Sequence, residues 1–178
     1  MGGLLDRYPR GPAYDEMFGA DGLPRPHTRA LYDALQTLTG EDLARRAEAR
    51  DRSFRDQGVV FSHAGEEWLF PLDLIPRLIP AAEWELVEAG VVQRVRALEA
   101  FLADVYGPQL AVRDGVIPAA LISSSTHYHR QATGIVSANG VRIQVSGIDV
   151  IRDEQGAWRV LEDNVRVPSG VSYVISNR

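Results

Sequence analysis

Three side chains near the end of the sequence carry oxygen atoms that could bind a divalent cation. Asp149 lies in a largely apolar segment, and Glu162 and Asn164 follow it after a turn at residues 153–156. Glu162 and Asn164 are two positions apart on an expected strand, so their side chains point to the same face. Carboxylate and amide oxygens are hard ligands, which suit Mg²⁺ bound jointly by a protein and nucleotide phosphates. We therefore predict a magnesium site formed by these three residues.

The pairing of the two strands decides whether Asp149 reaches the other ligands. If the turn pairs Arg152 with Ala157, Asp149 and Glu162 become diagonal neighbours on one face, with Cα atoms about 7–8 Å apart. A turn with a glycine bulge would shift the pairing and could place Asp149 with Asp163 instead. Acidic residues are also common beside turns, so the same pattern is compatible with a surface hairpin that binds no metal.

The residues that follow the predicted ligands could bind an anion. Transfer of a γ-phosphoryl group requires that its negative charge be neutralised, which bound metal ions achieve. Ser169 and Gly170 follow Pro168 at the expected start of a helix, where free backbone N–H groups attract anions. Ser169 could instead be an ordinary helix cap. We predict catalytic roles for two positively charged side chains, Arg166 and Arg152, and nucleotide contacts for Ser169 and Gly170.

Other polar side chains are weaker candidates. His127 and His129 would share one face of a strand and could form a metal pair, but no third ligand is evident nearby. Arg94 and Arg96 could bind an anionic substrate, although a solvated helix face explains them better.

Helices and short strands must position these side chains. Thr39-Gly40-Glu41-Asp42 is a capping-box pattern that should open one helix, and Gly58 should end it. Apolar spacing and stop signals predict helices at residues 26–39, 40–57, 80–89 and 91–105, and a last one that begins at residue 168. Alternating apolar residues predict a hairpin at residues 59–70 and strands at 141–151 and 158–165.

The composition excludes several classes of protein. The 178 residues carry a net charge of −5 and no cysteine, and an acidic balance argues against nucleic acid as a partner. No apolar run approaches the ~18 residues that span a membrane, and no signal peptide is evident, so we expect a cytoplasmic protein. All 19 basic residues are arginine, so a nucleotide site that needs lysine cannot be completed by this chain alone.

These elements predict an α+β chain in which N-terminal helices pack on an antiparallel sheet. Residues 1–25 are rich in glycine and proline and are expected to form an extended arm. Residues 26–178 are expected to form the remainder of the fold.

At the predicted ligands the sequence resembles the ATP-grasp superfamily, whose members carry an Asp on one strand and a Glu-x-Asn on the next that bind the magnesium ions of ATP. More specifically, the chain resembles the circularly permuted ATP-grasp family, type two. The matching segments span nearly the whole chain in order: Tyr14–Phe18, Phe70–Arg77, Gln93–Leu98, Phe101–Gly107, Gly147–Asp153 and Leu161–Tyr173.

The resemblance implies a ligase that joins carboxylates to amines through an acyl phosphate. It implies that ATP and two Mg²⁺ ions take part and that the substrate is peptide-like or amino-acid-like. The composition, separately, leads us to expect neither nucleic acid nor a membrane as a partner. By position, Asp149, Glu162 and Asn164 would bind the metal, and Arg166 and the Ser169–Gly170 backbone would face phosphate.

The resemblance also implies that residues 26–178 are the N-terminal portion of a circularly permuted ATP-grasp domain. Family members are longer, and their lysine-bearing nucleotide region would follow Arg178. This chain alone is therefore expected to be incomplete and inactive, with the rest of the ligase domain in the full-length chain. The alternatives are a truncated non-catalytic fragment, an interaction module that keeps the fold, and a two-metal hydrolase that uses the same acidic face.

Overall fold

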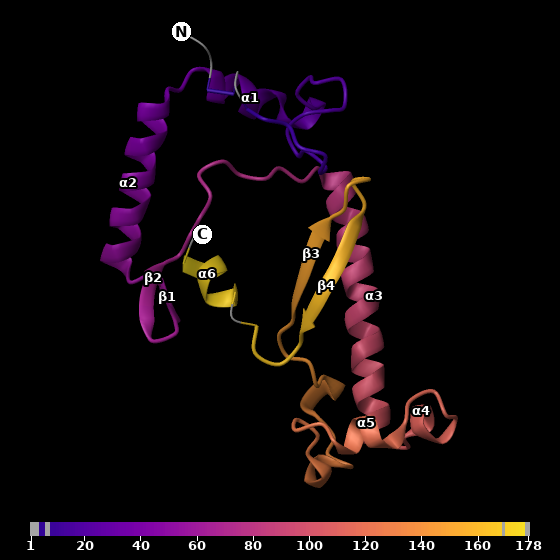
Figure 1. The fold of residues 1–178 in the computed structure, drawn as a ribbon. Helices are drawn as coiled ribbons and strands as arrows, with labels where there is room; N and C mark the ends of the chain where they lie inside the picture. Colours follow the sequence, from indigo (N-terminus) through magenta and orange to yellow (C-terminus); the bar gives the residue numbers. More distant parts are fainter. Residues whose placement is uncertain (1–3, 6–7, 169, 177–178) are drawn as a thin grey trace. The chain divides into compact units, whose positions relative to one another are not determined.

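The computed structural model describes residues 4–5, 8–168 and 170–176 (Figure 1). The helices are α1 (Arg29–Gln36), α2 (Gly40–Gln57), α3 (Ala81–Val105), α4 (Leu110–Arg113), α5 (Ala119–Ser123) and α6 (Gly170–Ser176), with 3₁₀ turns at Pro26–Thr28, Arg130–Ala132 and Ala138–Gly140. The strands are β1 (Val60–His63), β2 (Glu66–Leu69), β3 (Gly147–Arg152) and β4 (Trp158–Asn164). Among the described residues, no helix combines the length and apolar content needed to cross a membrane.

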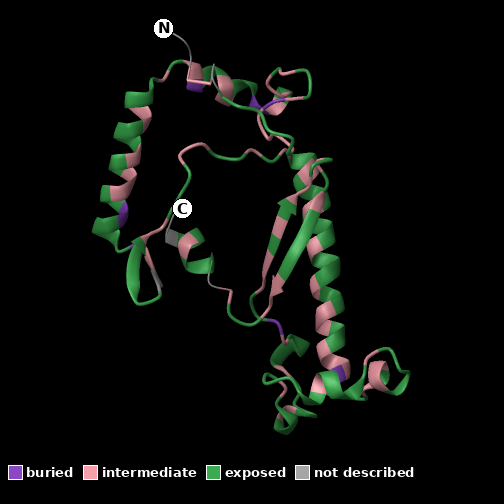
Figure 2. Ribbon diagram, viewed as in Figure 1, coloured by how far each residue is buried: buried purple, intermediate pink, exposed green. Residues whose placement is uncertain are grey.

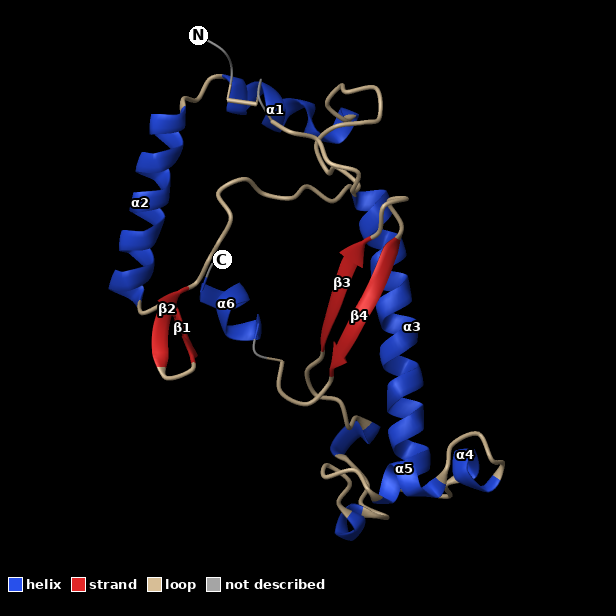
Figure 3. Cartoon of the chain, in the orientation of Figure 1, coloured by secondary structure: helices blue, strands red, loops and turns tan. Residues whose placement is uncertain are grey.

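The strands form two separate hairpins, β1 with β2 and β3 with β4 (Figure 3). Helices together with small antiparallel sheets are compatible with the predicted α+β class. The described strands do not, however, form the single sheet that the sequence analysis expects. In each hairpin, the two described strands form ladder hydrogen bonds only with each other, and a short turn connects them.

The chain divides into two compact units. Unit 1 comprises residues 1–83, 151–159 and 169–178, and unit 2 comprises residues 84–150 and 160–168. Figure 2 shows that few of the described residues are buried. Among the residues that the structure describes, the buried hydrophobic ones are Phe18, Leu35, Phe54 and Val59 in unit 1 and Val105 and Ile143 in unit 2.

Part of the expected N-terminal arm folds back on α1. Phe18 forms a backbone bridge with Pro24, and its buried ring packs edge-on against Tyr32 with centroids 5.7 Å apart. The Thr28 hydroxyl donates a hydrogen bond of 2.9 Å to the carbonyl oxygen of Met17. Residues 17–28 are therefore a folded part of unit 1, although they lack helix or strand before Pro26.

Helix α2 has both of the ends that its sequence predicts. The backbone N–H of Asp42 donates to the Thr39 hydroxyl, and the Asp42 carboxylate accepts the backbone N–H of Thr39, which completes the capping box. These contacts, with the Thr39 backbone first, lower the pKa of Asp42 to about 2. Gly58 ends the helix in the left-handed conformation, with φ of 67°.

Helix α3 is one continuous element, where the sequence analysis expects two helices separated at Gly90. A glycine inside a helix costs only about 1 kcal/mol relative to alanine. Gly90 is flanked on both sides by residues with helical apolar spacing, so that cost is not enough to stop the helix. Its 25 residues run without interruption from Ala81 to Val105.

Residues 141–146 are irregular, where the sequence analysis expects the first half of a strand. The carboxylate of Glu99, on α3, accepts the backbone N–H groups of Arg142 at 2.7 Å and Ile143 at 2.8 Å. A side chain thus satisfies the donors that a neighbouring strand would otherwise satisfy. The strand consequently begins only at Gly147, two residues before Asp149.

Candidate functional site

The turn between β3 and β4 contains a glycine bulge. The backbone N–H of Asp153 donates to the carbonyl of Ala157 at 3.0 Å, and the N–H of Gly156 donates to the carbonyl of Asp153 at 2.9 Å. Gly156 has φ of 83°, a left-handed conformation that favours glycine. Asp153 therefore lies opposite Ala157 and Arg152 opposite Trp158, so the simpler expected pairing of Arg152 with Ala157 is wrong by one residue.

The open end of the hairpin has a different pairing from its turn. A Cβ atom placed on Gly147 would lie 3.9 Å from the Cβ of Asn164, so these two residues are neighbours on one face. Between the ends, β3 has six residues and β4 has seven. One extra residue in a strand is a β-bulge, and from the different pairings at the two ends we infer one in β4.

With the inferred bulge, the predicted ligands are expected on one face. Asp149 lies two residues after Gly147, and Glu162 lies two residues before Asn164, so each shares the face of its neighbour. Counting from Gly147 beside Asn164, Asp149 lies opposite Glu162. The predicted alternative, in which Asp149 shares a face with Asp163, would hold only if the pairing at the turn continued unchanged to the open end.

Glu162 and Asn164 contact each other directly. The Asn164 side-chain NH₂ donates to a Glu162 carboxylate oxygen at 2.6 Å, which leaves the Asn164 amide oxygen available. Asp149 and Glu162 are exposed, and no arginine or histidine in the described residues pairs with either carboxylate. Two unneutralised carboxylates and an amide oxygen on one face are a donor set suited to a hard cation.

The described residues contain no group of three or more His, Cys, Asp or Glu side chains arranged to hold a metal. The predicted ligands are two carboxylates and one amide, and an asparagine does not count toward a group of this kind. Their role in metal binding therefore stays a prediction. His127 and His129 are not on a strand, because residues 127–129 form irregular backbone after α5, and the predicted strand-face pair is wrong.

Asp163 points away from its neighbours and is bound by α3. Arg94 donates two hydrogen bonds to the Asp163 carboxylate, from Nε at 2.6 Å and from a terminal nitrogen at 2.7 Å. These hydrogen bonds lower the pKa of Asp163 and raise that of Arg94. The sequence analysis favours a solvated role for Arg94, and no local signal connects two residues that lie 69 positions apart.

Arg152, one of the two predicted catalytic arginines, is held firmly within unit 1. Its side chain is 6% exposed and donates to Glu16 at 3.1 Å and Glu83 at 2.6 Å. The guanidinium also lies over the rings of Tyr14 and Trp158, at 4.8 and 4.1 Å from their centroids. The hydrogen bond from Arg152 lowers the pKa of Glu83. The catalytic role of Arg152 stays a prediction.

The other predicted phosphate contacts are less defined. Arg166 is exposed at a bend after β4 in unit 2. Ser169 lies outside the described residues. Gly170 is the first residue of α6, in unit 1, where the stacking of Phe70 on Tyr173 at 4.4 Å joins that helix to the segment after β2. The roles of these three residues stay predictions.

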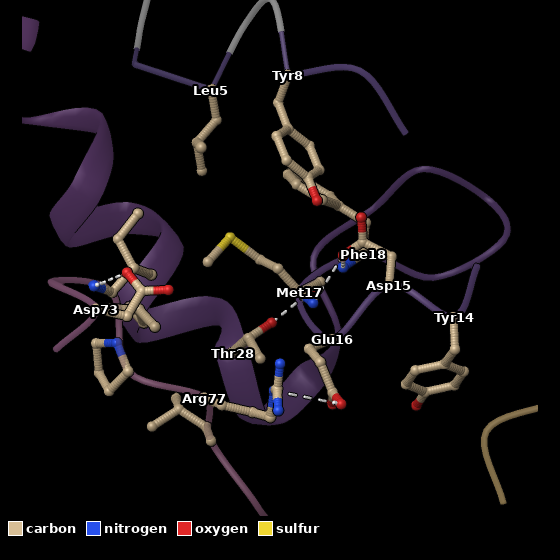
Figure 4. Close-up of a pocket in the computed structure, with 14 residues that line it drawn as sticks. Leu5, Tyr8, Tyr14, Asp15, Glu16, Met17, Phe18, Thr28, Asp73 and Arg77 are labelled. Carbon is tan, nitrogen blue, oxygen red and sulfur yellow. Dashed lines mark hydrogen bonds and ion pairs between the residues drawn. The ribbon is translucent and has the colours of Figure 1, made fainter. Parts of the chain in front are cut away.

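A pocket of about 350 Å³ in unit 1 has no counterpart in the sequence analysis (Figure 4). Met17 and Phe18 contribute apolar surface, and Arg77 forms an ion pair of 3.6 Å with Glu16 at its edge. The carboxylate of Asp73 accepts the backbone N–H of Ile75 at 3.0 Å. Because the lining combines residues near positions 5–31 and 73–78, spacing along the chain could not reveal it.

Comparison with known proteins identifies relatives of this chain. A family model described as a circularly permuted ATP-grasp matches residues 76–178. An uncharacterized protein of Mycobacterium tuberculosis is 55% identical over 166 residues, which cover 93% of this chain and 30% of the relative. A protein of Frankia casuarinae, whose name proposes a glutamate–cysteine ligase, is 43% identical over 178 residues, which cover 98% of this chain and 20% of the relative. The chain thus spans about a third or less of these relatives.

Proposed function

The chain belongs to the circularly permuted ATP-grasp family, and on that basis we propose that it carries the metal ligands of an ATP- and Mg²⁺-dependent carboxylate–amine ligase. The family and the names of two relatives support a ligase-type function. The finer proposal is supported by the contact of Asn164 with Glu162 and by the exposure of Asp149 and Glu162, neither of which has a basic partner among the described residues. An arginine beside them would neutralise the carboxylates and remove the need for a cation.

In this proposal each ligand contributes an oxygen atom. Asp149 and Glu162 supply negative charge from neighbouring strands, and Asn164 supplies its amide oxygen because its NH₂ group is engaged by Glu162. Bound Mg²⁺ would neutralise the charge of the phosphoryl group during transfer. The exposed Arg166 would contribute a second positive charge beside the phosphates, and the Ser169–Gly170 backbone would supply N–H groups.

Arg152 has a supporting role in the proposal. Its contacts with Glu16 and Glu83 connect the N-terminal segment and the first turn of α3 to the turn end of the hairpin. We assign it to anchoring the end of β3 at residues 151–152, which belongs to unit 1, in place of a direct phosphate contact. Metal binding by the chain without nucleotide should be weak, because Mg²⁺ in sites of this kind depends on phosphate oxygens.

The substrate proposal is an acid and an amine of amino-acid or peptide character, joined through an acyl phosphate in the cytoplasm. Glutamate and cysteine are the first pair to test, since the names of two relatives mention them. We expect the gene product that contains this chain to release ADP and inorganic phosphate when ATP, Mg²⁺, the acid and the amine are all present. A coupled spectrophotometric assay for ADP measures this release.

Omission of the acid or of the amine is the control for that assay, because each should abolish product formation. Mass spectrometry of the joined product then distinguishes ligation from simple ATP hydrolysis. Cleavage of a substrate in the absence of ATP would contradict the ligase and favour the hydrolase alternative. Absence of any nucleotide turnover with a broad set of acids and amines would favour the non-catalytic module.

A further inference from the structure

Asp163 lies between two of the proposed metal ligands but faces the other side of its strand. Glu162 and Asn164 flank it directly in β4, and alternate residues of a strand point in opposite directions. The Asp163 side chain is 19% exposed and the Arg94 side chain is 43% exposed. The contact of Asp163 with Arg94 on the opposite face can thus fix the backbone that carries Glu162 and Asn164.

The contact between Arg94 and Asp163 has the geometry that fixes an orientation. Two nitrogen atoms of one planar guanidinium bind the two oxygen atoms of one carboxylate. This fork restrains the carboxylate in direction as well as in distance, whereas a lysine would act as a single point charge. Arg94 therefore restricts rotation of β4 about its own axis at Asp163.

The bulge in β4 explains why such a restraint is needed. A bulge leaves one residue unpaired and locally disrupts the ladder of hydrogen bonds. Strand pairing alone therefore defines the direction of the Glu162 and Asn164 side chains less well than in a regular hairpin. The ion pair to α3 supplies a fixed point from a 25-residue helix, immediately between the two ligands.

The ion pair between Arg94 and Asp163 should matter more for the position of the metal ligands than for the stability of the whole fold. Partly exposed ion pairs contribute little to the free energy of folding. Residues that orient metal ligands without touching the metal commonly change metal affinity by about 10–100-fold. Loss of this ion pair, which lies beside two ligands, should therefore lower metal affinity much more than it lowers the free energy of unfolding.

We propose that Arg94 is a positioning residue, which holds Asp163 so that Glu162 and Asn164 present their oxygen atoms together to a divalent cation. This inference rests on the proposed function, because it requires that the hairpin bind a metal. It assigns to α3 a specific task that the family relationship does not provide. Arg94 would touch neither the metal nor the nucleotide.

The test compares Arg94→Gln with Arg96→Gln in the gene product that contains this chain. Arg96 is an exposed arginine on the same helix, so its substitution removes the same charge. Mn²⁺ is the probe, titrated by electron paramagnetic resonance in the presence of a non-hydrolysable ATP analogue. We expect Arg94→Gln to weaken Mn²⁺ binding by about 10-fold and Arg96→Gln to leave it unchanged, with the two melting temperatures nearly equal.

A reversed pair provides a second readout. The double variant Arg94→Asp with Asp163→Arg should bind Mn²⁺ more tightly than either single variant, because the ion pair is restored in the opposite direction. Unchanged Mn²⁺ affinity in Arg94→Gln, beside normal binding by the unaltered protein, would overturn the positioning role alone. Failure of the unaltered protein to bind Mn²⁺ with the nucleotide would overturn the proposed function as well.

Discussion

Substitution of Glu162 by Gln should reduce ATP-dependent ligation by about 100–1,000-fold, a loss like that caused by removing one preorganised group that stabilises charge in the transition state. The new side chain keeps the length and one oxygen atom of the original, but it loses the negative charge that would attract the cation. It can also still accept the Asn164 hydrogen bond. The measurement is the rate of ADP release by the gene product at saturating ATP and Mg²⁺.

The matched control for this prediction is Glu85→Gln. Glu85 is exposed on α3, and its substitution changes the net charge by the same amount. It should leave the rate within about two-fold of the unaltered protein, since surface substitutions rarely matter. Both variants should melt at nearly the same temperature, because Glu162 is also exposed. Equal activity of the two variants would remove Glu162 from the metal site.

Substitution of Arg152 by Met should lower the free energy of unfolding by about 2–3 kcal/mol. Removing one partner of a fully buried ion pair costs about 3–5 kcal/mol, because the other partner is left without compensation. The expected loss is smaller here since the Glu16 and Glu83 side chains are 24% and 31% exposed. Loss of the contacts with the aromatic rings of Tyr14 and Trp158 adds to the effect.

Urea denaturation followed by circular dichroism measures this loss, with Arg159→Met as the control. Arg159 is on the same hairpin, but its side chain is 64% exposed and forms an ion pair with Asp153 alone. An exposed pair of that kind contributes less than about 1 kcal/mol. If the two variants are destabilised equally, Arg152 does not anchor the hairpin, and a direct role at the phosphates becomes the better explanation for it.

Local signals predicted the parts of the fold that depend on neighbouring residues. The capping box at Thr39 and Asp42 and the glycine stop at Gly58 fix both ends of α2, because the groups that satisfy each end lie within a few residues of it. The first hairpin was predictable for the same reason. Its strands flank a two-residue turn, Ala64–Gly65, and both turn residues have positive φ.

Tertiary contacts decided the parts that the sequence analysis missed. The alternation at residues 141–145 favours a strand, but Glu99 binds the backbone donors of Arg142 and Ile143 from a helix more than forty positions earlier. No rule based on periodicity includes that carboxylate. At Gly90 the sequence analysis expected a break that the structure lacks. The residues on either side continue one helix, which outweighs the small cost of a glycine in its interior.

The candidate site was predictable in its composition and less so in its geometry. A spacing of two places Glu162 and Asn164 on one face of any strand, and their contact agrees with this. The position that we infer for Asp149, opposite Glu162, depends on a bulge in β4 that would compensate for the glycine bulge at Gly156. Two opposing irregularities of this kind cannot be located from residue types alone, and neither can the contact of Arg94 with the strand.

Anomalous scattering from Mn²⁺ in crystals of the gene product with a non-hydrolysable ATP analogue tests the central claim most directly. The account predicts a manganese peak about 2.0–2.3 Å from carboxylate oxygens of Asp149 and Glu162 and from the amide oxygen of Asn164, as hard-cation geometry requires. A peak bound to other residues, or Asp149 and Glu162 on opposite faces of the hairpin, would contradict it.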